Sequence, residues 1–571
     1  MYTRRWSTSP REHEVTVEHD VRVRMPDGTH LDGNIFRPAS PGRFPVLLGA
    51  HPYNKDMQSP PGMRPVGFTP MRGWMESGDS TYFARRGYVH AVFNVRGSGS
   101  SEGFYQLGGA LEVQDLCHLV GWLAAQPWSS GAVGMFGVSY FARMAKLVAA
   151  EGPPGLKAVF APWSGTDDYR HRWYHGGILA SGFLAHWRNS AHNPRYRSFY
   201  KAQHGDEKYR QAIAQAMKDE EVMAIEPLRK ALESPEEGTN AVIVDVLLHP
   251  FDGPFWRERS AKDDRAKVPA YLGACWGIYG LHLPGAFTAW EEWKGPKKML
   301  LGPPVYLDRP VYQLHEEALR WFDHWLKGRD TGIMDEPAVR CFIPGTGEWK
   351  ALDDWPPPDA RWTTFFLHAD GTLSEHEPWP GESTVSFNES PSEHGEARFA
   401  TPPFVENTEL LGPAVVHLQL ETDDTEALVF VTLLSIGMDG KEAELTRGWL
   451  RASQRKLKEG CPPWAPVPAH EKREPLEPGK VYELAIAIVP TARLFRAGER
   501  LAVRIKGADD EPPQTSLQAI ARNHVRRLRP ARITLHCDAS RPSWIDLPIT
   551  RGNIIGTFFS GGDITQFGLS R

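Results

Sequence analysis

Residues 132–150 of the chain read AVGMFGVSYFARMAKLVAA, and this stretch decides the fold. Its apolar start, residues 132–136, predicts a strand, and residues 140–150 predict the helix that follows. The intervening Gly-Val-Ser-Tyr, residues 137–140, allows a sharp turn between the two. A strand, a tight turn that carries a serine and a helix, in this order, are the setting of a nucleophile elbow.

Ser139 is the candidate nucleophile of this turn. A serine held there projects above the sheet, the helix N-terminus places positive partial charge beneath it, and the amide of Tyr140 can donate to an oxyanion. The usual elbow has glycine two positions after the serine, where this chain has Phe141. An N-cap serine in an ordinary strand-to-helix turn is the alternative interpretation of Ser139.

Strand and helix signals alternate on both sides of this turn. Residues 46–50 and 88–97 read as buried strands, and residues 111–126 have helical periodicity that ends before Pro127. Two further apolar runs, PAYLGACW and KKMLLGP, come before an amphipathic helix at residues 315–327. This alternation predicts a doubly wound, mainly parallel sheet.

The pattern changes twice along the chain. Residues 163–245 are rich in His, Tyr, Arg and Trp with helical stretches, which predicts a helical insertion that caps the site. After Gly345, short β-rich runs alternate with Gly, Pro, Asp and Glu, which predicts a β-sandwich or jelly roll. The predicted domains are therefore an α/β domain at 1–162 and 246–344, the cap at 163–245 and an all-β domain at 345–571.

Bulk properties narrow the classes of function. A net charge of −5 gives no electrostatic case for nucleic acid or an anionic membrane as a partner. Five scattered cysteines show no metal-binding spacing and predict reduced, mostly buried thiols. No stretch is apolar and long enough to span a bilayer, and residues 1–14 lack a signal core, so a cytoplasmic protein with a small-molecule substrate is expected. No metal or cofactor motif is evident, and the choice between monomer and homodimer stays open.

Further segments carry a resemblance to a known family. HPYNK at 51–55 lies just after an early strand, RGSGSSEG at 96–103 follows the next strand, and residues 110–140 run into the serine. In order and spacing these segments resemble the cocaine esterase and X-prolyl dipeptidyl-peptidase family, and TPPFVENTELLGPAVVHLQLETD and LFRAGERLAVRI are similar to its C-terminal jelly-roll domain. The resemblance covers nearly the whole chain. It implies an α/β-hydrolase domain with a helical cap, a C-terminal jelly roll and acyl transfer from an ester or amide.

The resemblance also implies a role for Tyr53. In the family, the tyrosine of an Asn-Pro-Tyr-x-Lys segment donates its hydroxyl to the oxyanion, and here His51 replaces the asparagine. A buried tyrosine that packs under a loop is the alternative interpretation. Arg96, in the RGSGSSEG loop, is expected to tie loops together by hydrogen bonds rather than to contact substrate.

The family pattern breaks at the acid and the base that a serine nucleophile needs. In the family the acid follows a strand in a Gly-Trp-Tyr-Asp segment, and the base follows the next strand in a Gly-Pro-Trp-x-His segment. The matching positions here are Ile278, or a neighbour, and Tyr306. No aspartate lies between Asp264 and Asp308, so a small shift of the alignment does not restore the acid. The family's two residues therefore cannot be carried over.

His282 is the provisional substitute for the base. It lies in the loop where the acid was expected, at the carboxyl edge of the sheet where α/β sites form, and an imidazole there could reach Ser139. A histidine bonded within its own loop is the alternative. Asp308 could orient a base or be structural, and Tyr306 as a base would need a strongly lowered pKa. His249 is expected to be a packing residue and His315 a surface or capping group.

Three functions remain open at this stage. The first is a hydrolase or acyltransferase with Ser139 as nucleophile, Tyr53 and the Tyr140 amide at the oxyanion, and His282 as the base. The second is a lyase, isomerase or cyclase on an altered site of the same fold. The third is a binding protein that has lost catalysis. Retention of Ser139 and Tyr53 argues mildly against the third.

Overall fold

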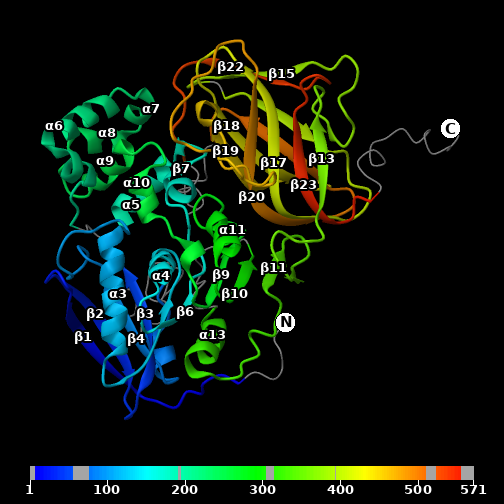
Figure 1. The fold of residues 1–571 in the computed structure, drawn as a ribbon. Coiled ribbons are helices and arrows are strands. Elements are labelled where there is room, and N and C mark those ends of the chain that lie inside the picture. The colour runs from blue at the N-terminus through cyan, green and yellow to red at the C-terminus, as the bar shows by residue number, and fades with distance from the viewer. Residues whose placement is uncertain are drawn as a thin grey trace.

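A computed structural model describes residues 7–53, 55, 76–190, 195–303, 314–392, 394–509 and 523–554, with the main chain alone for 186–190. Figure 1 shows three parts: an α/β domain, a group of helices above it and an all-β domain beside those helices. Tyr306 and Asp308 lie outside the described residues.

The α/β domain is built on a ten-stranded sheet in the order β1-β2-β4-β3-β5-β6-β9-β10-β11-β12. The central strands from β4 to β11 are parallel neighbours, and β1, β2 and β12 pair antiparallel at the edges. The predicted mainly parallel sheet is thereby confirmed. The strands are β1 Val15–Arg24, β2 His30–Pro38, β3 Phe44–His51, β4 Val89–Asn94, β5 Ser129–Phe136, β6 Leu156–Phe160, β9 Ala270–Cys275, β10 Lys297–Gly302, β11 Val339–Ile343 and β12 Glu348–Leu352.

Helices cover both faces of the central strands, which are therefore buried on both sides, whereas the edge strands β1 and β12 are partly exposed. Strand β3 shows the alternation: Val46 and Leu48 belong to the core under α3 (Ala110–Ala124) and α4 (Tyr140–Glu151). Leu47 points to the opposite core, which contains Phe83 of α2 (Ser80–Ala84) and Trp321 of α13 (His315–Lys327). Helix α11 (Leu283–Glu292) follows β9 and adds to the first core.

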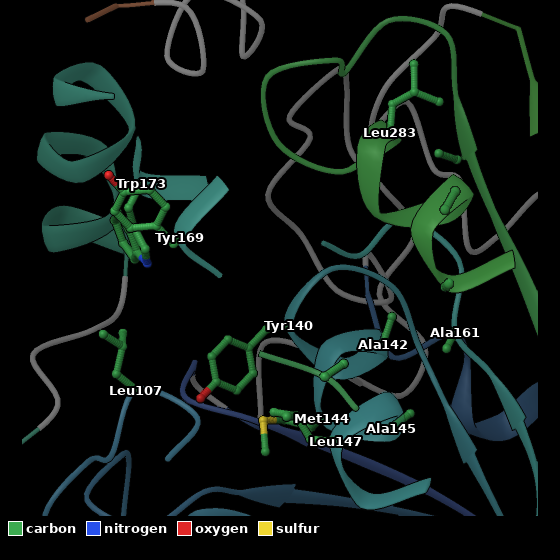
Figure 2. Packing of buried hydrophobic residues seen from close by; sticks show 14 of the residues in the cluster. Leu107, Tyr140, Ala142, Met144, Ala145, Leu147, Ala161, Tyr169, Trp173 and Leu283 are labelled. Atoms are coloured by element: carbon green, nitrogen blue, oxygen red, sulfur yellow. The ribbon is translucent and has the colours of Figure 1, made fainter. Parts of the chain in front are cut away.

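The insertion between β6 and β9 is largely helical and lies over the α/β domain (Figure 1). Its Tyr169 and Trp173 belong to the same core as Tyr140 and Met144 of α4 (Figure 2), so the insertion is packed onto the domain below. Its elements are a π-helical turn Tyr169–Trp173, β7 Tyr174–His175, β8 Ile178–Leu179, α5 Ser181–Ser190, α6 Phe199–Ala216, α7 Glu220–Met223, α8 Glu226–Glu233, α9 Asn240–Leu248 and α10 Pro254–Arg259.

The C-terminal part is an all-β domain whose eleven strands form one antiparallel, barrel-like arrangement. It encloses a core of its own, and the predicted all-β architecture is confirmed. The strands are β13 Arg361–Leu367, β14 Leu373–Ser374, β15 Thr384–Glu389, β16 Glu396–Ala400, β17 Thr408–Thr422, β18 Leu428–Ile436, β19 Glu442–Arg451, β20 Tyr482–Phe495, β21 Arg500–Lys506, β22 Ala531–His536 and β23 Trp544–Arg551.

Strand β19 of the all-β domain makes contacts with the helical insertion. The amide of Arg451 donates to the Gly176 carbonyl at 2.8 Å, and its guanidinium pairs with Glu221 of α7 at 2.6 Å. A Cβ at Gly176 would lie 2.0 Å from the Trp449 carbonyl oxygen, so the two backbones meet where only glycine fits. The exact domain boundaries stay a prediction; β11 and β12 lie on either side of residue 345 and both pair within the first sheet.

Three further findings concern membrane spans, metal sites and cysteines. Among the described residues, the helices are all too short or too polar to cross a lipid bilayer. Within the same residues, no cluster of three or more His, Cys, Asp or Glu side chains is arranged to hold a metal ion. The described cysteines are all free thiols.

Candidate active site

The turn after β5 has the backbone of a nucleophile elbow. Ser139 stands at φ 57°, ψ −120°, at the N-terminus of α4, and its side chain makes no capping hydrogen bond to that helix. An ordinary N-cap serine has β-region angles and an oxygen that accepts from the helix, so this interpretation does not describe Ser139. Ser139 has a strained, positive φ and is only partly buried. Both features are expected of a serine whose hydroxyl must reach a substrate.

Two glycines make room for the elbow. A Cβ at Gly137, where φ is +145°, would lie 2.4 Å from the Phe141 Cβ and 2.7 Å from the Glu76 carbonyl oxygen. A Cβ at Gly49 of β3 would lie 3.0 Å from the Phe141 ring. The ring instead stacks on His51, with centroids 4.5 Å apart. The bulky residue at the usual glycine position of the elbow is therefore accommodated by Gly49.

Backbone hydrogen bonds hold the elbow from three sides. The Ser139 amide donates to the Trp163 carbonyl at 2.9 Å, beyond the end of β6. The Arg143 amide donates to the Ser139 carbonyl, which starts α4, also at 2.9 Å. The Val138 amide donates to the Glu76 carbonyl at 2.9 Å and so ties the turn to the segment before α2. The serine is thereby fixed at the carboxyl edge of the sheet, where ligands of α/β domains bind.

Tyr140 anchors the start of α4 through its side chain. Its hydroxyl donates to Glu112 of α3 at 2.5 Å, and the Gly108 amide donates to the other Glu112 oxygen at 3.1 Å. Figure 2 shows the ring reaching from α4 toward Leu107. The side chain is thus committed to the core, and the part of Tyr140 suited to an oxyanion is its main-chain amide, in the first turn where N–H groups lack acceptors within the helix.

Tyr53 lies beside this helix start. It follows β3, is partly buried, and its amide donates to the His51 Nδ1 at 3.1 Å. Its ring meets the Tyr140 ring edge-on with centroids 6.4 Å apart. Tyr53 therefore lies next to the N-terminus of α4, where a donor to the oxyanion is needed. The donor role of its hydroxyl stays a prediction.

Glu76 is the acidic group at the elbow, and it was missed from the sequence. The residue is buried, with 8% exposed, and its carbonyl accepts the Val138 amide of the elbow. Burial raises the pKa of the Glu76 carboxyl to about 8, against a smaller lowering by the Ser139 side chain. Its second oxygen, Oε2, is buried and has no hydrogen-bond partner among the described residues. No motif marks Glu76, because its contact with Ser139 joins positions that are distant along the chain.

His282 is placed at the start of α11 and is buried. Burial, and secondarily the charge of Arg172, lower its pKa to about 3. An imidazole with so low a pKa is a weak proton acceptor, and its role as base stays a prediction. At the family's acid position, Ile278 is buried and its carbonyl accepts the His282 amide at 3.1 Å. The neighbouring Tyr279 hydroxyl donates to Glu444 of β19.

Three other expectations have definite outcomes. Arg96 forms two 2.7 Å bonds to Asp115 and one of 2.9 Å to Asp27, so its predicted loop-tying role is confirmed. His249 stacks on Phe255 with centroids 3.9 Å apart and is a packing residue, as predicted. The prediction that His315 is a surface or capping group is wrong: it is buried, and its Nε2 accepts the Asp79 amide at 2.9 Å, because the start of α13 packs against the segment before α2.

Comparison with known proteins agrees with this architecture. Residues 27–305 match the family described as X-Pro dipeptidyl-peptidase (S15 family), and residues 331–546 match the X-Pro dipeptidyl-peptidase C-terminal non-catalytic domain. Cocaine esterase of Rhodococcus sp. is 26% identical over 603 residues, which cover 94% of this chain and 99% of that protein.

Solved structures are similar over the same length. A CocE/NonD family hydrolase from Staphylococcus aureus superimposes with a TM-score of 0.76 at 26% identity and covers 93% of both chains. An aminopeptidase from a Thaumarchaeota archaeon has a TM-score of 0.71 at 19% identity, with 95% of this chain and 97% of that one covered. The second likeness concerns the fold alone.

Proposed function

Because the chain belongs to the X-Pro dipeptidyl-peptidase and CocE/NonD family of serine hydrolases, we propose that it cleaves an ester or amide, or transfers its acyl group, through an acyl-enzyme at Ser139. The observation that carries this proposal is the strained elbow that presents a partly exposed serine at the carboxyl edge of the sheet. A substrate of small-molecule size suits a site covered by a helical insertion.

The oxyanion is proposed to form between Tyr140 and Tyr53. The Tyr140 amide belongs to the first turn of α4, whose dipole favours negative charge. The phenol of Tyr53 is a neutral donor at the same helix start. Two such donors stabilise the tetrahedral intermediate more than the substrate carbonyl, and this difference is what lowers the barrier.

The base of this reaction is proposed to be non-standard. The family's acid position holds the buried Ile278, and Tyr306 and Asp308 lie outside the described residues. The sequence indicates His282 as a base, but its buried, weakly basic imidazole supports that role poorly. The proton acceptor for Ser139 is therefore to be sought among the groups that touch its hydroxyl.

A fluorophosphonate probe tests the proposal directly. The wild-type chain is expected to be labelled at Ser139, as located by peptide mass spectrometry, and the Ser139→Ala variant to stay unlabelled. Hydrolysis of p-nitrophenyl esters by the two proteins gives a second readout. Circular dichroism of both proteins shows that they are folded. Folded wild-type protein without a labelled Ser139 would contradict the proposal.

The altered acid and base positions favour one second candidate. A lyase, isomerase or cyclase on the same site would use Ser139 and Tyr53 to polarise a carbonyl without forming an acyl-enzyme. Turnover that survives Ser139→Ala and is lost in Tyr53→Phe would favour this candidate over the hydrolase. A protein that has lost catalysis would bind a ligand and convert nothing in either assay.

A further inference from the structure

We propose that Glu76 is the proton acceptor of Ser139, so that the nucleophile is activated by a carboxylate in direct contact and not by a histidine. This inference rests on the proposed acyl-enzyme at Ser139 and adds the residue that makes it form. The Val138 amide, one residue before the nucleophile, donates to the Glu76 carbonyl at 2.9 Å, and interaction with the Ser139 side chain lowers the pKa of the Glu76 carboxyl, so this acid lies beside the group that it would deprotonate.

The main chain holds Glu76 in register with the elbow. Its carbonyl accepts the Val138 amide at 2.9 Å, one residue before the nucleophile. A Cβ at Gly137 would lie 2.7 Å from the same carbonyl oxygen, so the elbow and this segment are in close contact. The backbone of Glu76 is therefore attached to the elbow one residue before Ser139.

The surroundings of Glu76 are not those of a structural acid. A buried carboxylate is normally paired with a cation or bonded at both oxygens, because an unpaired one costs several kcal/mol. Among the described residues, no lysine or arginine forms an ion pair with Glu76, and Oε2 has no hydrogen-bond partner. A buried carboxyl with a raised pKa and one oxygen without a partner is typical of a functional group, whereas a structural acid is usually paired or fully hydrogen-bonded.

The proposed steps balance in protons and bonds. The Ser139 Oγ attacks the acyl carbon while its proton moves to the Glu76 carboxylate, which becomes a carboxylic acid. That acid protonates the departing alkoxide or amine as the carbon–oxygen or carbon–nitrogen bond breaks. In the second half, Glu76 takes a proton from water, the hydroxide attacks the acyl carbon, and the proton returns to Ser139 Oγ as the acid product leaves.

The ionisation of Glu76 supports this assignment. Burial raises its pKa to about 8, which matches a base that works near neutral to mildly alkaline pH. Because the ionised form is the base, labelling of Ser139 should become faster as pH rises from 6 to about 8 and then level off. Burial lowers the pKa of His315 to about 4 and of His90 to about 3, so both stay neutral over this range. Among the described residues, the titratable groups near this segment include Asp79, whose amide donates to His315 of α13, Tyr82 of α2, which stacks on His315, and His90 of β4, whose pKa is lowered in part by His315.

The test measures the rate of fluorophosphonate labelling of Ser139 against pH. The Glu76→Gln variant is expected to be labelled at least about 100-fold more slowly than wild type at pH 8, with Glu76→Asp between them. Glu226→Gln, which removes an exposed carboxylate on α8, serves as the matched control at wild-type rate. Exogenous formate should restore part of the rate in Glu76→Ala.

The outcomes separate this inference from the proposed function. Wild-type labelling with an unchanged rate and pH profile in Glu76→Gln would overturn the role of Glu76 and leave the acyl-enzyme standing. An unlabelled wild-type Ser139 would overturn both. If Glu76→Gln does not fold, the wild-type profile still decides: a rate that rises through about pH 8 supports Glu76, and one that is flat from pH 6 to 9 contradicts it.

Discussion

Two glutamates are buried beside the elbow, and they differ in what surrounds them. Glu112 accepts the Tyr140 hydroxyl on one oxygen and the Gly108 amide on the other, and the charge of Arg143 is near. At Glu76, the Ser139 side chain is the one group that lowers the pKa of the carboxyl, and Oε2 is buried without a hydrogen-bond partner among the described residues. The Glu112 carboxyl has a structural role, since both of its oxygens accept hydrogen bonds. The Glu76 carboxyl has an oxygen without a partner in the described chain and is the one that we propose takes part in the reaction.

The raised pKa values of the two groups express the same difference. Burial raises the pKa of Glu112 to about 7 and that of Glu76 to about 8. Three groups, Tyr140, Arg143 and the Gly108 amide, act against the rise at Glu112, whereas Ser139 acts alone at Glu76. A pKa shift by itself therefore does not mark a catalytic group; the identity of the partner atom does.

The largest expected effect is on the rate of acylation. Glu76→Gln should lower the rate of Ser139 labelling by about 100- to 10,000-fold, because it removes a general base. Glu112→Gln should lower it by less than about tenfold, because the amide still accepts the Tyr140 hydroxyl. Stopped-flow labelling of the two variants at pH 8 measures the ratio. Equal losses of labelling rate in the two variants would show that Glu76 is no more important for the reaction than Glu112.

The next effect is on stability and depends on pH. The pKa of the Glu76 carboxyl is about 4.5 in the unfolded chain and about 8 in the folded protein. As pH rises from about 5 to 8, the unfolded chain loses this proton while the folded protein keeps it, so the free energy of unfolding falls. Glu76→Gln should therefore be more stable than wild type by a few kcal/mol at pH 8, with the gain vanishing near pH 4.

Denaturant unfolding of both proteins at pH 4, 6 and 8 measures this difference. A variant that is less stable than wild type at pH 8 would show that Glu76 is a structural group after all. The corresponding gain for Glu112→Gln should be smaller, because its carboxyl is better satisfied and its pKa lies lower.

A smaller loss is expected when the anchor of α4 is cut. Tyr140→Phe leaves Glu112 without its hydroxyl donor and should cost about 1–3 kcal/mol of stability. The Tyr140 amide is unchanged, so the rate of labelling at 20 °C below the melting temperature should stay within about tenfold of wild type. Thermal melts and labelling rates of one preparation separate the two effects. A loss of labelling as large as that of Glu76→Gln would mean that the phenol, and not the amide, serves the reaction.

The sequence predicted the elbow well because its signal is local. An apolar run, a glycine, a serine and a helix in one stretch fix the strand β5, the turn and α4, and the structure has them at 129–136 and 140–151. The sequence also shows that Phe141 replaces the usual glycine of the elbow. It does not show how the bulky ring is accommodated, because Gly49, which makes room for it, lies on a neighbouring strand. Local patterns therefore identify the element and not the neighbours that complete it.

Glu76 could not be found in this way. Its role depends on the placement of a segment from before α2 against a turn about sixty residues later, and no periodicity or motif encodes that contact. Arg96 shows the opposite case, since a buried arginine near several acidic residues has an evident structural use. The acidic partner of a nucleophile is thus the part of the site that tertiary structure alone provides.

The smallest effect on the labelling rate is expected from a substitution at His282. This experiment decides between His282 and Glu76 as the base. With a pKa lowered to about 3, this imidazole holds no proton between pH 6 and 9 and accepts one poorly. His282→Asn should therefore change the labelling rate of Ser139 by less than about tenfold and leave the rise toward pH 8 in place. The same fluorophosphonate assay, run beside Glu76→Gln, makes the comparison. A loss of 100-fold or more in His282→Asn, with a normal melt, would return the base to the loop after β9 and leave Glu76 as the group that holds the serine in position.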